Sequence, residues 1–165
     1  MGLFYDLVIV GGGMVGLSLA RNILNSSNQK QFKIAIIEKE SSTGVHSSGR
    51  NSGVLHAGLY YPPNSIKAKV CVKGKRRLEK WIKNNGLSYN QCGKVIVATK
   101  KEELNSLDYL YKRGQKNGIK GLKKLSPNEL FEYEPNANGL SALYCPETGI
   151  IDYSKVCEQL SKNIQ

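Results

Sequence analysis

The chain has 165 residues, of which 40% are hydrophobic, enough to bury the core of one domain or slightly more. No apolar stretch reaches the length that spans a bilayer, and no basic segment precedes the N-terminal apolar run, which argues against a secretory signal. The formal net charge of +11 is spread along the chain with few aromatic residues between the cations, so we predict a solvated lysine-rich surface and no nucleic-acid partner, with peripheral contact to an anionic membrane left open.

The first predicted element is a short buried strand at residues 6–10, followed by a turn of glycines and a helix. Gly11, Gly13 and Gly16 have the spacing G-x-G-x-x-G. In dinucleotide-binding folds the first glycine permits a tight turn, the second lets the backbone approach a pyrophosphate, and the third lets the helix pack close to its strand. The phosphate would lie at the helix N-terminus, where free N–H groups favour an anion. The pattern by itself is weak, because glycine-rich turns also occur for packing reasons.

A second apolar run follows at residues 34–37, after a polar break at residues 25–31, and it leads directly into Glu38. A carboxylate about twenty residues beyond the glycines is suited to accept hydrogen bonds from ribose hydroxyls. The two runs and the helix between them therefore predict a parallel βαβ unit that binds a dinucleotide. A βαβ unit without a nucleotide, with an acid at the strand end by chance, is the less favoured alternative.

Residues 41–61 are rich in glycine and serine, which lets the backbone lie close to a ligand. We expect a loop and short helix along the far half of the dinucleotide, with phosphate donors at Ser47, Ser48, Arg50, Asn51 and Ser52. A flexible linker is the alternative, but the end of this stretch is too apolar for a solvated tether.

The second half of the chain predicts an α+β arrangement that differs from the βαβ start. We expect a helix at 66–85, a strand at 91–99, an amphipathic helix at 101–117, a helix capped by Ser126 and a last helix capped by Asp152. Four cysteines show no C-x-x-C spacing and no neighbouring histidine, so no metal site is predicted. Reduced thiols and a cytoplasmic location follow as expectations, with peripheral attachment at the inner face of the plasma membrane as a variant.

Residues 6–17 resemble the start of the FAD-dependent amino-acid and hydroxy-acid oxidases grouped with D-amino acid oxidase and glycine oxidase. Residues 49–74, GRNSGVLHAGLYYPPNSIKAKVCVKG, closely resemble the L-2-hydroxyglutarate dehydrogenase/oxidase branch of that group. Residues 92–98 and 146–153 support the same branch, and the similarity covers essentially the whole chain.

The resemblance implies an FAD enzyme that oxidises a small 2-hydroxy acid, L-2-hydroxyglutarate, to 2-oxoglutarate by hydride transfer to the flavin, with oxygen or a quinone as electron acceptor. It implies these cofactor-binding residues: Gly11, Gly13, Gly16, Glu38, Lys39, Ser48, Arg50, Asn51, Ser52 and Gly53. His56 is the catalytic candidate, because its ordinary pKa near 6.5 suits proton transfer. It is read as the base, a hydrogen-bond partner of the flavin, or its covalent attachment point, as in the related dimethylglycine dehydrogenases; a packed structural histidine is the alternative.

The expected fold is an incomplete FAD-binding Rossmann-like βαβ domain followed by part of an α+β substrate domain. The predicted ranges are 1–86 for the FAD-binding part, 87–152 for the substrate or cap part, and 153–165 for a helix leading back to the first domain. Family members are about twice as long or more, so a truncated product, a fragment or half of a split protein completed by a C-terminal chain is expected. Two other functions compete: an FAD oxidoreductase acting on an amine or on glycerol 3-phosphate, and a non-catalytic fragment.

Overall fold

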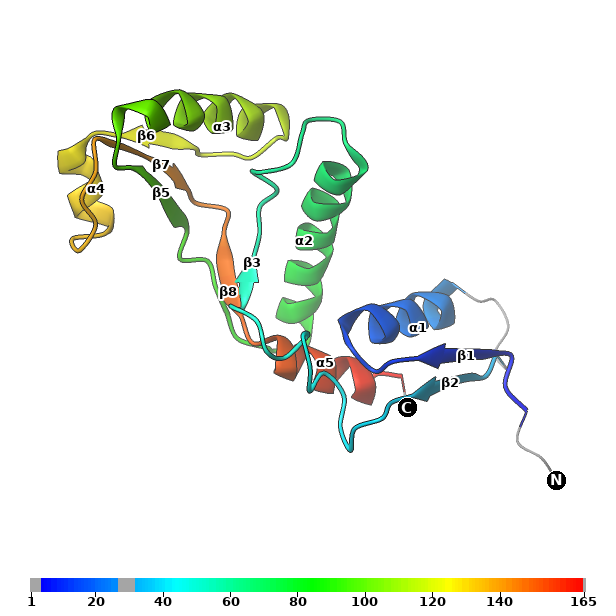
Figure 1. Ribbon diagram of the computed structural model, residues 1–165. Coiled ribbons are helices and arrows are strands. Elements are labelled where there is room, and N and C mark those ends of the chain that lie inside the picture. The colour runs from blue at the N-terminus through cyan, green and yellow to red at the C-terminus, as the bar shows by residue number, and fades with distance from the viewer. Residues whose placement is uncertain (1–3, 27–31, 165) are drawn as a thin grey trace. The chain divides into compact units, whose positions relative to one another are not determined.

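The computed structural model describes residues 4–26 and 32–164 and contains both helices and sheets, which agrees with the predicted α/β class (Figure 1). The chain forms two compact units. Unit 1 comprises Met1–Gly53, Asn85–Ser88 and Asp152–Gln165, and unit 2 comprises Val54–Asn84 and Tyr89–Ile151. The ranges expected from the sequence divide the chain differently, because they assign residues 54–84 to the first domain. As boundaries of the family's domains, 1–86, 87–152 and 153–165 stay a prediction.

Unit 1 is built on the predicted βαβ start. Strands β1 (Leu7–Val10) and β2 (Ile34–Ile37) pair in parallel, and α1 (Met14–Ser26) connects them. The last helix, α5 (Tyr153–Lys162), packs on α1, and the carboxylate of Asp152 caps it by accepting two backbone N–H groups. Most of the predicted polar break at residues 25–31 lies outside the described residues. The glycine turn therefore follows a strand and begins a helix, as a dinucleotide site requires.

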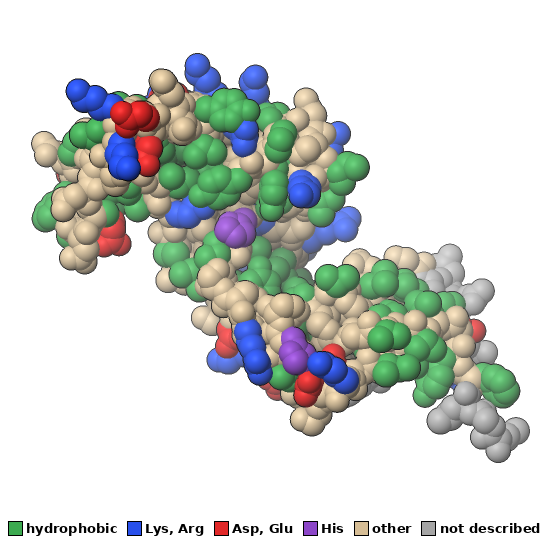
Figure 2. All heavy atoms as spheres, viewed as in Figure 1, with side chains coloured by type: hydrophobic (Ala, Val, Ile, Leu, Met, Phe, Trp, Pro, Cys, Tyr) green, Lys and Arg blue, Asp and Glu red, His purple; other side chains and the backbone are tan. Residues whose placement is uncertain are grey.

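The core of unit 1 is one-sided. Leu17 and Ala20 of α1 are buried, together with residues of α5, but several large apolar side chains remain exposed: Val8, Val10, Val15, Leu19 and Ile37. In Figure 2, hydrophobic side chains gather on the surface over α1 and β1. Val15 and Leu19 of α1 are apolar but exposed, because only one side of α1 meets the sheet and α5.

Unit 2 contains two antiparallel three-stranded sheets, with strand orders β3-β8-β4 and β5-β7-β6. The strand bounds are β3 (Val54–Leu55), β4 (Tyr89–Asn90), β5 (Lys94–Ala98), β6 (Lys123–Leu125), β7 (Ser141–Cys145) and β8 (Gly149–Ile151). The helices are α2 (Ile66–Asn84), α3 (Leu104–Lys116), which follows the 3-10 turn η1 (Lys101–Glu103), and α4 (Pro127–Tyr133). The predicted helices and the strand at 91–99 are present, whereas β3, β4, β6 and β8 were not foreseen.

The core of unit 2 forms where helices cover the second sheet. Leu107 of α3 packs with Leu143 and Cys145 of β7, and Leu130 of α4 packs with Leu125 and Ala142. Ser126 and Glu129 form the predicted capping box at the start of α4. All four cysteines are free. Among the described residues, no helix is long and apolar enough to cross a membrane.

Candidate functional site

The glycine turn between β1 and α1 owes its shape to two positions. Gly11 has φ of +109°, a conformation that side chains disfavour, and its N–H donates to the Ile37 carbonyl at 2.8 Å. At Gly16 an added Cβ would collide with the Gly11 carbonyl oxygen and lie 3.2 Å from Ile9 Cγ2. Gly16 therefore lets the first turn of α1 pack directly on the end of β1, which is the role that the glycine pattern predicts.

Glu38 lies at the end of β2, beside the turn. Its Oε2 accepts the Gly12 N–H at 2.7 Å, and its Oε1 accepts the Glu40 N–H at 3.1 Å. These backbone hydrogen bonds, that from Glu40 first, lower the pKa of Glu38 below its ordinary value. An ionised carboxylate has about four acceptor positions, so the two bonds fix Glu38 and leave further positions for ribose hydroxyls.

Ser48 closes the other side of the turn. Its Oγ accepts the Met14 N–H at 3.1 Å, and a Cβ on Gly13 would lie 2.9 Å from the same oxygen. The Gly44 N–H donates to the Gly12 carbonyl, which ties the loop after β2 to the turn. Gly13, Glu38 and Ser48, predicted from separate parts of the sequence, are thus brought together.

The other predicted cofactor-binding residues are not brought to the turn by any described hydrogen bond. Lys39 is exposed and pairs with Glu40, 3.7 Å from Nζ to Oε1. Asn51 caps its own loop: its Nδ2 donates to the carbonyls of Ser47 and Ser48, and its Oδ1 accepts the Gly53 N–H at 2.8 Å. The side chains of Arg50 and Ser52 are exposed.

The described residues fit the adenosine end of FAD. The turn has no room for side chains at Gly13 or Gly16, and it begins a helix of 13 residues, whose N-terminus attracts a phosphate. A fixed carboxylate lies beside it. At this helix N-terminus the Ser48 hydroxyl already accepts one hydrogen bond, from the Met14 N–H. As cofactor ligands, these residues stay predictions.

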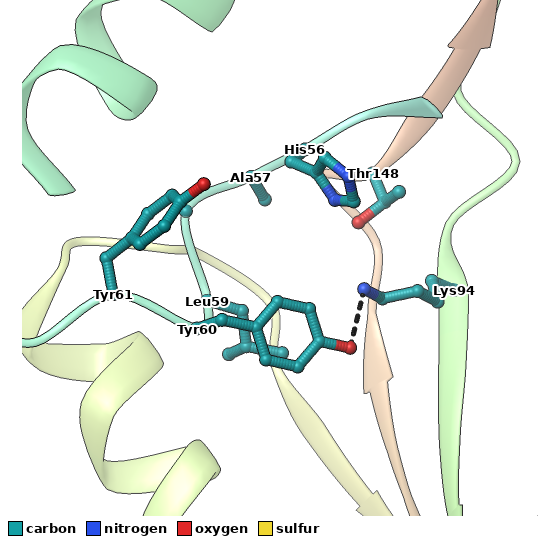
Figure 3. Close-up of a pocket in the computed structure, with 8 residues that line it drawn as sticks. His56, Ala57, Leu59, Tyr60, Tyr61, Lys94 and Thr148 are labelled. Carbon is teal, nitrogen blue, oxygen red and sulfur yellow. Dashed lines mark hydrogen bonds between the residues drawn. The ribbon is translucent and has the colours of Figure 1, made fainter. Parts of the chain in front are cut away.

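His56 follows β3 in unit 2 and lines a cavity of about 60 Å³ together with Tyr60, Lys94 and Thr148 (Figure 3). A water molecule needs about 10–15 Å³ on the same measure, so the cavity holds a few waters or one small polar group. Partial burial, and then the positive charge of Lys94, lower the pKa of His56 below its ordinary value of 6.5. The imidazole is therefore neutral at pH 7 and able to accept a proton.

Sequence reasoning missed the other polar residues of this cavity. Lys94 Nζ donates to the Tyr60 hydroxyl at 2.9 Å and lies 4.3 Å from the centre of the Tyr60 ring. Thr148 is buried in the turn between β7 and β8. The one available signal was the lysine that begins the otherwise apolar run KVIVA of β5.

The other histidine, His46, lies in the loop after β2. Its Nε2 is 2.7 Å from Glu40 Oε1, and its side chain is half exposed. It contacts neither the glycine turn nor the cavity of His56 through any described hydrogen bond.

Curated relatives are named L-2-hydroxyglutarate dehydrogenase. The chain is 44% identical over 161 residues to the mitochondrial enzyme of Homo sapiens, covering 98% of this chain and 34% of that protein. It is 46% identical over 162 residues to the mitochondrial enzyme of Dictyostelium discoideum, covering 97% and 36%. The predicted resemblance to this branch is confirmed, and the chain spans about a third of the length of these relatives.

The predicted cytoplasmic location, with the inner face of the plasma membrane as a variant, is wrong by this comparison. The relatives from Pongo abelii, Bos taurus and Homo sapiens are named mitochondrial. The prediction rested on two observations: the four cysteines lack C-x-x-C spacing, and the N-terminal apolar run does not look like a secretory signal. Both argue against secretion, and neither distinguishes the cytoplasm from the mitochondrion.

Solved structures of two oxidases have similar folds. The dithionite-reduced L-alpha-glycerophosphate oxidase of Mycoplasma pneumoniae with FAD bound has a TM-score of 0.87 and 29% identity, covering 97% of this chain and 42% of that one. Glycine oxidase from Geobacillus kaustophilus has a TM-score of 0.82 and 23% identity, covering 97% and 44%, a likeness of fold alone. The predicted partial α/β FAD-binding fold is confirmed.

The family model for FAD dependent oxidoreductases, DAO, matches residues 6–165. This match includes both the glycine turn with Glu38 and the cavity with His56. Such a family implies FAD as cofactor, a small-molecule substrate and an electron acceptor in general terms. The chain belongs to the DAO family of FAD dependent oxidoreductases.

Proposed function

We propose that the protein oxidises the C2 hydroxyl of L-2-hydroxyglutarate to 2-oxoglutarate with FAD as cofactor. The observation that carries the proposal is the 39–46% identity of nearly the whole chain to several L-2-hydroxyglutarate dehydrogenases. Identity to the glycerophosphate oxidase is 29%, which favours the hydroxy acid over glycerol 3-phosphate. The activity is proposed for an enzyme of which this chain corresponds to about a third.

In this proposal unit 1 holds the adenosine end of the cofactor. The turn at Gly11, Gly13 and Gly16 receives the pyrophosphate, and Glu38 accepts hydrogen bonds from the ribose hydroxyls. The polar side chains of Lys39, Ser48, Arg50, Asn51 and Ser52, together with the Gly53 backbone, are assigned to the path from the pyrophosphate towards the flavin. FAD, when bound, supplies the acceptor for the hydride that leaves C2.

His56 is the proposed base. Its lowered pKa keeps a ring nitrogen unprotonated at pH 7, so it is able to take the proton of the C2 hydroxyl as C2 loses its hydride. The carbon becomes a ketone, one proton passes to His56, and two electrons pass on to oxygen or a quinone. A separate chain carrying the remaining length of the relatives is a further proposed partner.

A visible spectrum of the purified chain tests the proposal. Retained flavin bands that bleach without oxygen when L-2-hydroxyglutarate is added would support it, with the D-enantiomer and glycerol 3-phosphate as controls. A colourless, aggregating chain would refute catalysis by this chain alone. Bleaching by glycerol 3-phosphate in place of L-2-hydroxyglutarate would refute the proposed substrate.

The variant His56→Gln tests the base separately. It should abolish substrate-driven bleaching while the chain keeps its FAD, because Gln cannot take up the proton. His46→Gln is the matched control and should bleach as the original chain does. Unchanged bleaching in His56→Gln would remove His56 from the catalytic step.

A further inference from the structure

Lys94 is a half-buried cation without a counter-ion in the part of the chain that the structure describes. No described carboxylate lies within ion-pairing distance of its Nζ, whereas the buried Lys75 pairs with Glu79 and Glu147. The Nζ of Lys94 instead meets the Tyr60 hydroxyl and ring at the wall of the cavity (Figure 3).

The donors at this wall are matched to a carboxylate. An ammonium group has three N–H donors, and the bond to Tyr60 uses one of them. The Tyr60 oxygen accepts that bond, so its own O–H is free to donate. Two neighbouring donors, one of them charged, can therefore bind the two oxygens of one carboxylate through charge-assisted hydrogen bonds.

The size of the cavity restricts where the rest of such a ligand lies. His56 and Lys94 line the same space of about 60 Å³. A ligand that presents a carboxylate to Lys94 and a hydroxyl to His56 must therefore carry these groups close together. This arrangement is found in 2-hydroxy acids, where the carboxylate and the hydroxyl are on adjacent carbons.

We propose that Lys94 and Tyr60 form a binding site for the carboxylate next to the reacting carbon of a 2-hydroxy acid. The identity of the acid rests on the proposed function, whereas the carboxylate site rests on Lys94, Tyr60 and the cavity. Lys94 is then a substrate-binding residue that also determines specificity, because it selects a carboxylate over the uncharged end of a simple alcohol.

Ligand binding to the chain of 165 residues tests the site without any turnover. The probe is glycolate, the smallest 2-hydroxy acid, and its uncharged amide, glycolamide, is the control ligand. Proton NMR follows the imidazole signals of both histidines, with His46 in unit 1 as an internal reference. Glycolate should shift the His56 signal and leave the His46 signal unchanged, and glycolamide should shift neither. Equal shifts with both ligands, or none with glycolate, would overturn the proposal.

Variants then assign the effect to the lysine. Lys94→Met should raise the dissociation constant of glycolate by about tenfold or more, the loss expected for a hydrogen bond to a charged group. Lys94→Arg should restore most of the affinity, and Lys112→Met, an exposed lysine of α3, should match the original chain. Undiminished affinity in Lys94→Met would overturn the proposal.

A milder variant protects the test against misfolding. Tyr60→Phe keeps the ring and removes one donor, so it should weaken glycolate binding by about threefold to tenfold; unchanged affinity would remove Tyr60 from the site. Flavin bleaching separates this inference from the proposed function. If L-2-hydroxyglutarate fails to bleach the flavin but glycolate still binds through Lys94, the oxidation falls and the carboxylate site stands. If bleaching proceeds with the same KM in Lys94→Met, the site falls and the oxidation stands.

Discussion

Gly16→Ala tests whether close contact between α1 and β1 maintains the cofactor turn. In an exposed helix interior, Ala is favoured over Gly by about 1 kcal/mol. At Gly16 the new methyl would overlap the Gly11 carbonyl oxygen and press on Ile9 Cγ2 at 3.2 Å. Overpacking of this kind costs about 1–3 kcal/mol, so the clash exceeds the helix preference. We expect a lower free energy of unfolding and weaker binding of FAD or ADP.

The matched control is Gly74→Ala in α2. A Cβ at Gly74 has no neighbour within 4 Å, so only the helix preference acts there and the unfolding free energy should rise by about 0.5–1 kcal/mol. Urea denaturation followed by circular dichroism gives both values, and fluorescence titration gives nucleotide affinity. If Gly16→Ala is as stable as Gly74→Ala and binds nucleotide as the original chain does, the close-contact argument is refuted.

The further predictions concern the carboxylate of Glu38, the imidazole of His56 and the helix cap at Ser126. Glu38→Gln should weaken ADP binding by about tenfold, since it removes a charged acceptor. The control Glu158→Gln, at an exposed position, should bind ADP as the original chain does. Equal ADP affinity of the original chain and both variants would remove Glu38 from the ribose site. Because the folded pKa of Glu38 is lowered, its stabilising contribution should be present above pH 4.5 and be lost as the pH falls through that lower value, seen as a drop in melting temperature absent from Glu38→Gln. An NMR titration should give His56 a pKa below 6.5, so its contribution to stability should be fully present above pH 6.5 and be lost as the pH falls through the lower folded value; a pKa above 6.5 would contradict the effect of partial desolvation and of Lys94. Ser126→Ala should lower the unfolding free energy by about 0.5–2 kcal/mol in urea denaturation, and the exposed Ser106→Ala by less than about 0.5, with equal losses counting against the cap.

Local signals in the sequence predicted local structure well. The glycine turn, the acidic end of β2 and the caps at Ser126 and Asp152 each depend on residues within a few positions of one another, so their patterns are visible without the fold. The glycine spacing also implies a pair of parallel strands whose ends meet at one edge of the sheet. Glu38 contacts the turn at this edge.

Features that depend on distant pairing were not predictable from the sequence. The cavity residues His56, Lys94 and Thr148 come together only because β3 pairs with β8 and β5 pairs with β7. Burial was not predictable for the same reason: Ile66 and Val70 are apolar residues of α2, as the buried Ile82 is, but they are 80% and 62% exposed. Helical periodicity identifies a face, and only the neighbouring elements decide whether that face is covered.

The three-part make-up of unit 1 has a consequence for the order of folding. Helix α5 packs on α1 although about 130 residues of sequence separate them, and the whole of unit 2 is encoded in between. Such a contact closes a long loop, which is slow in an unfolded chain, and a chain emerging from the ribosome lacks α5 until all of unit 2 has been made. Unit 2 is therefore expected to form first and to shorten this loop. The packing of α5 on the nucleotide-binding unit is thus completed after unit 2, although the glycine turn precedes unit 2 in the sequence.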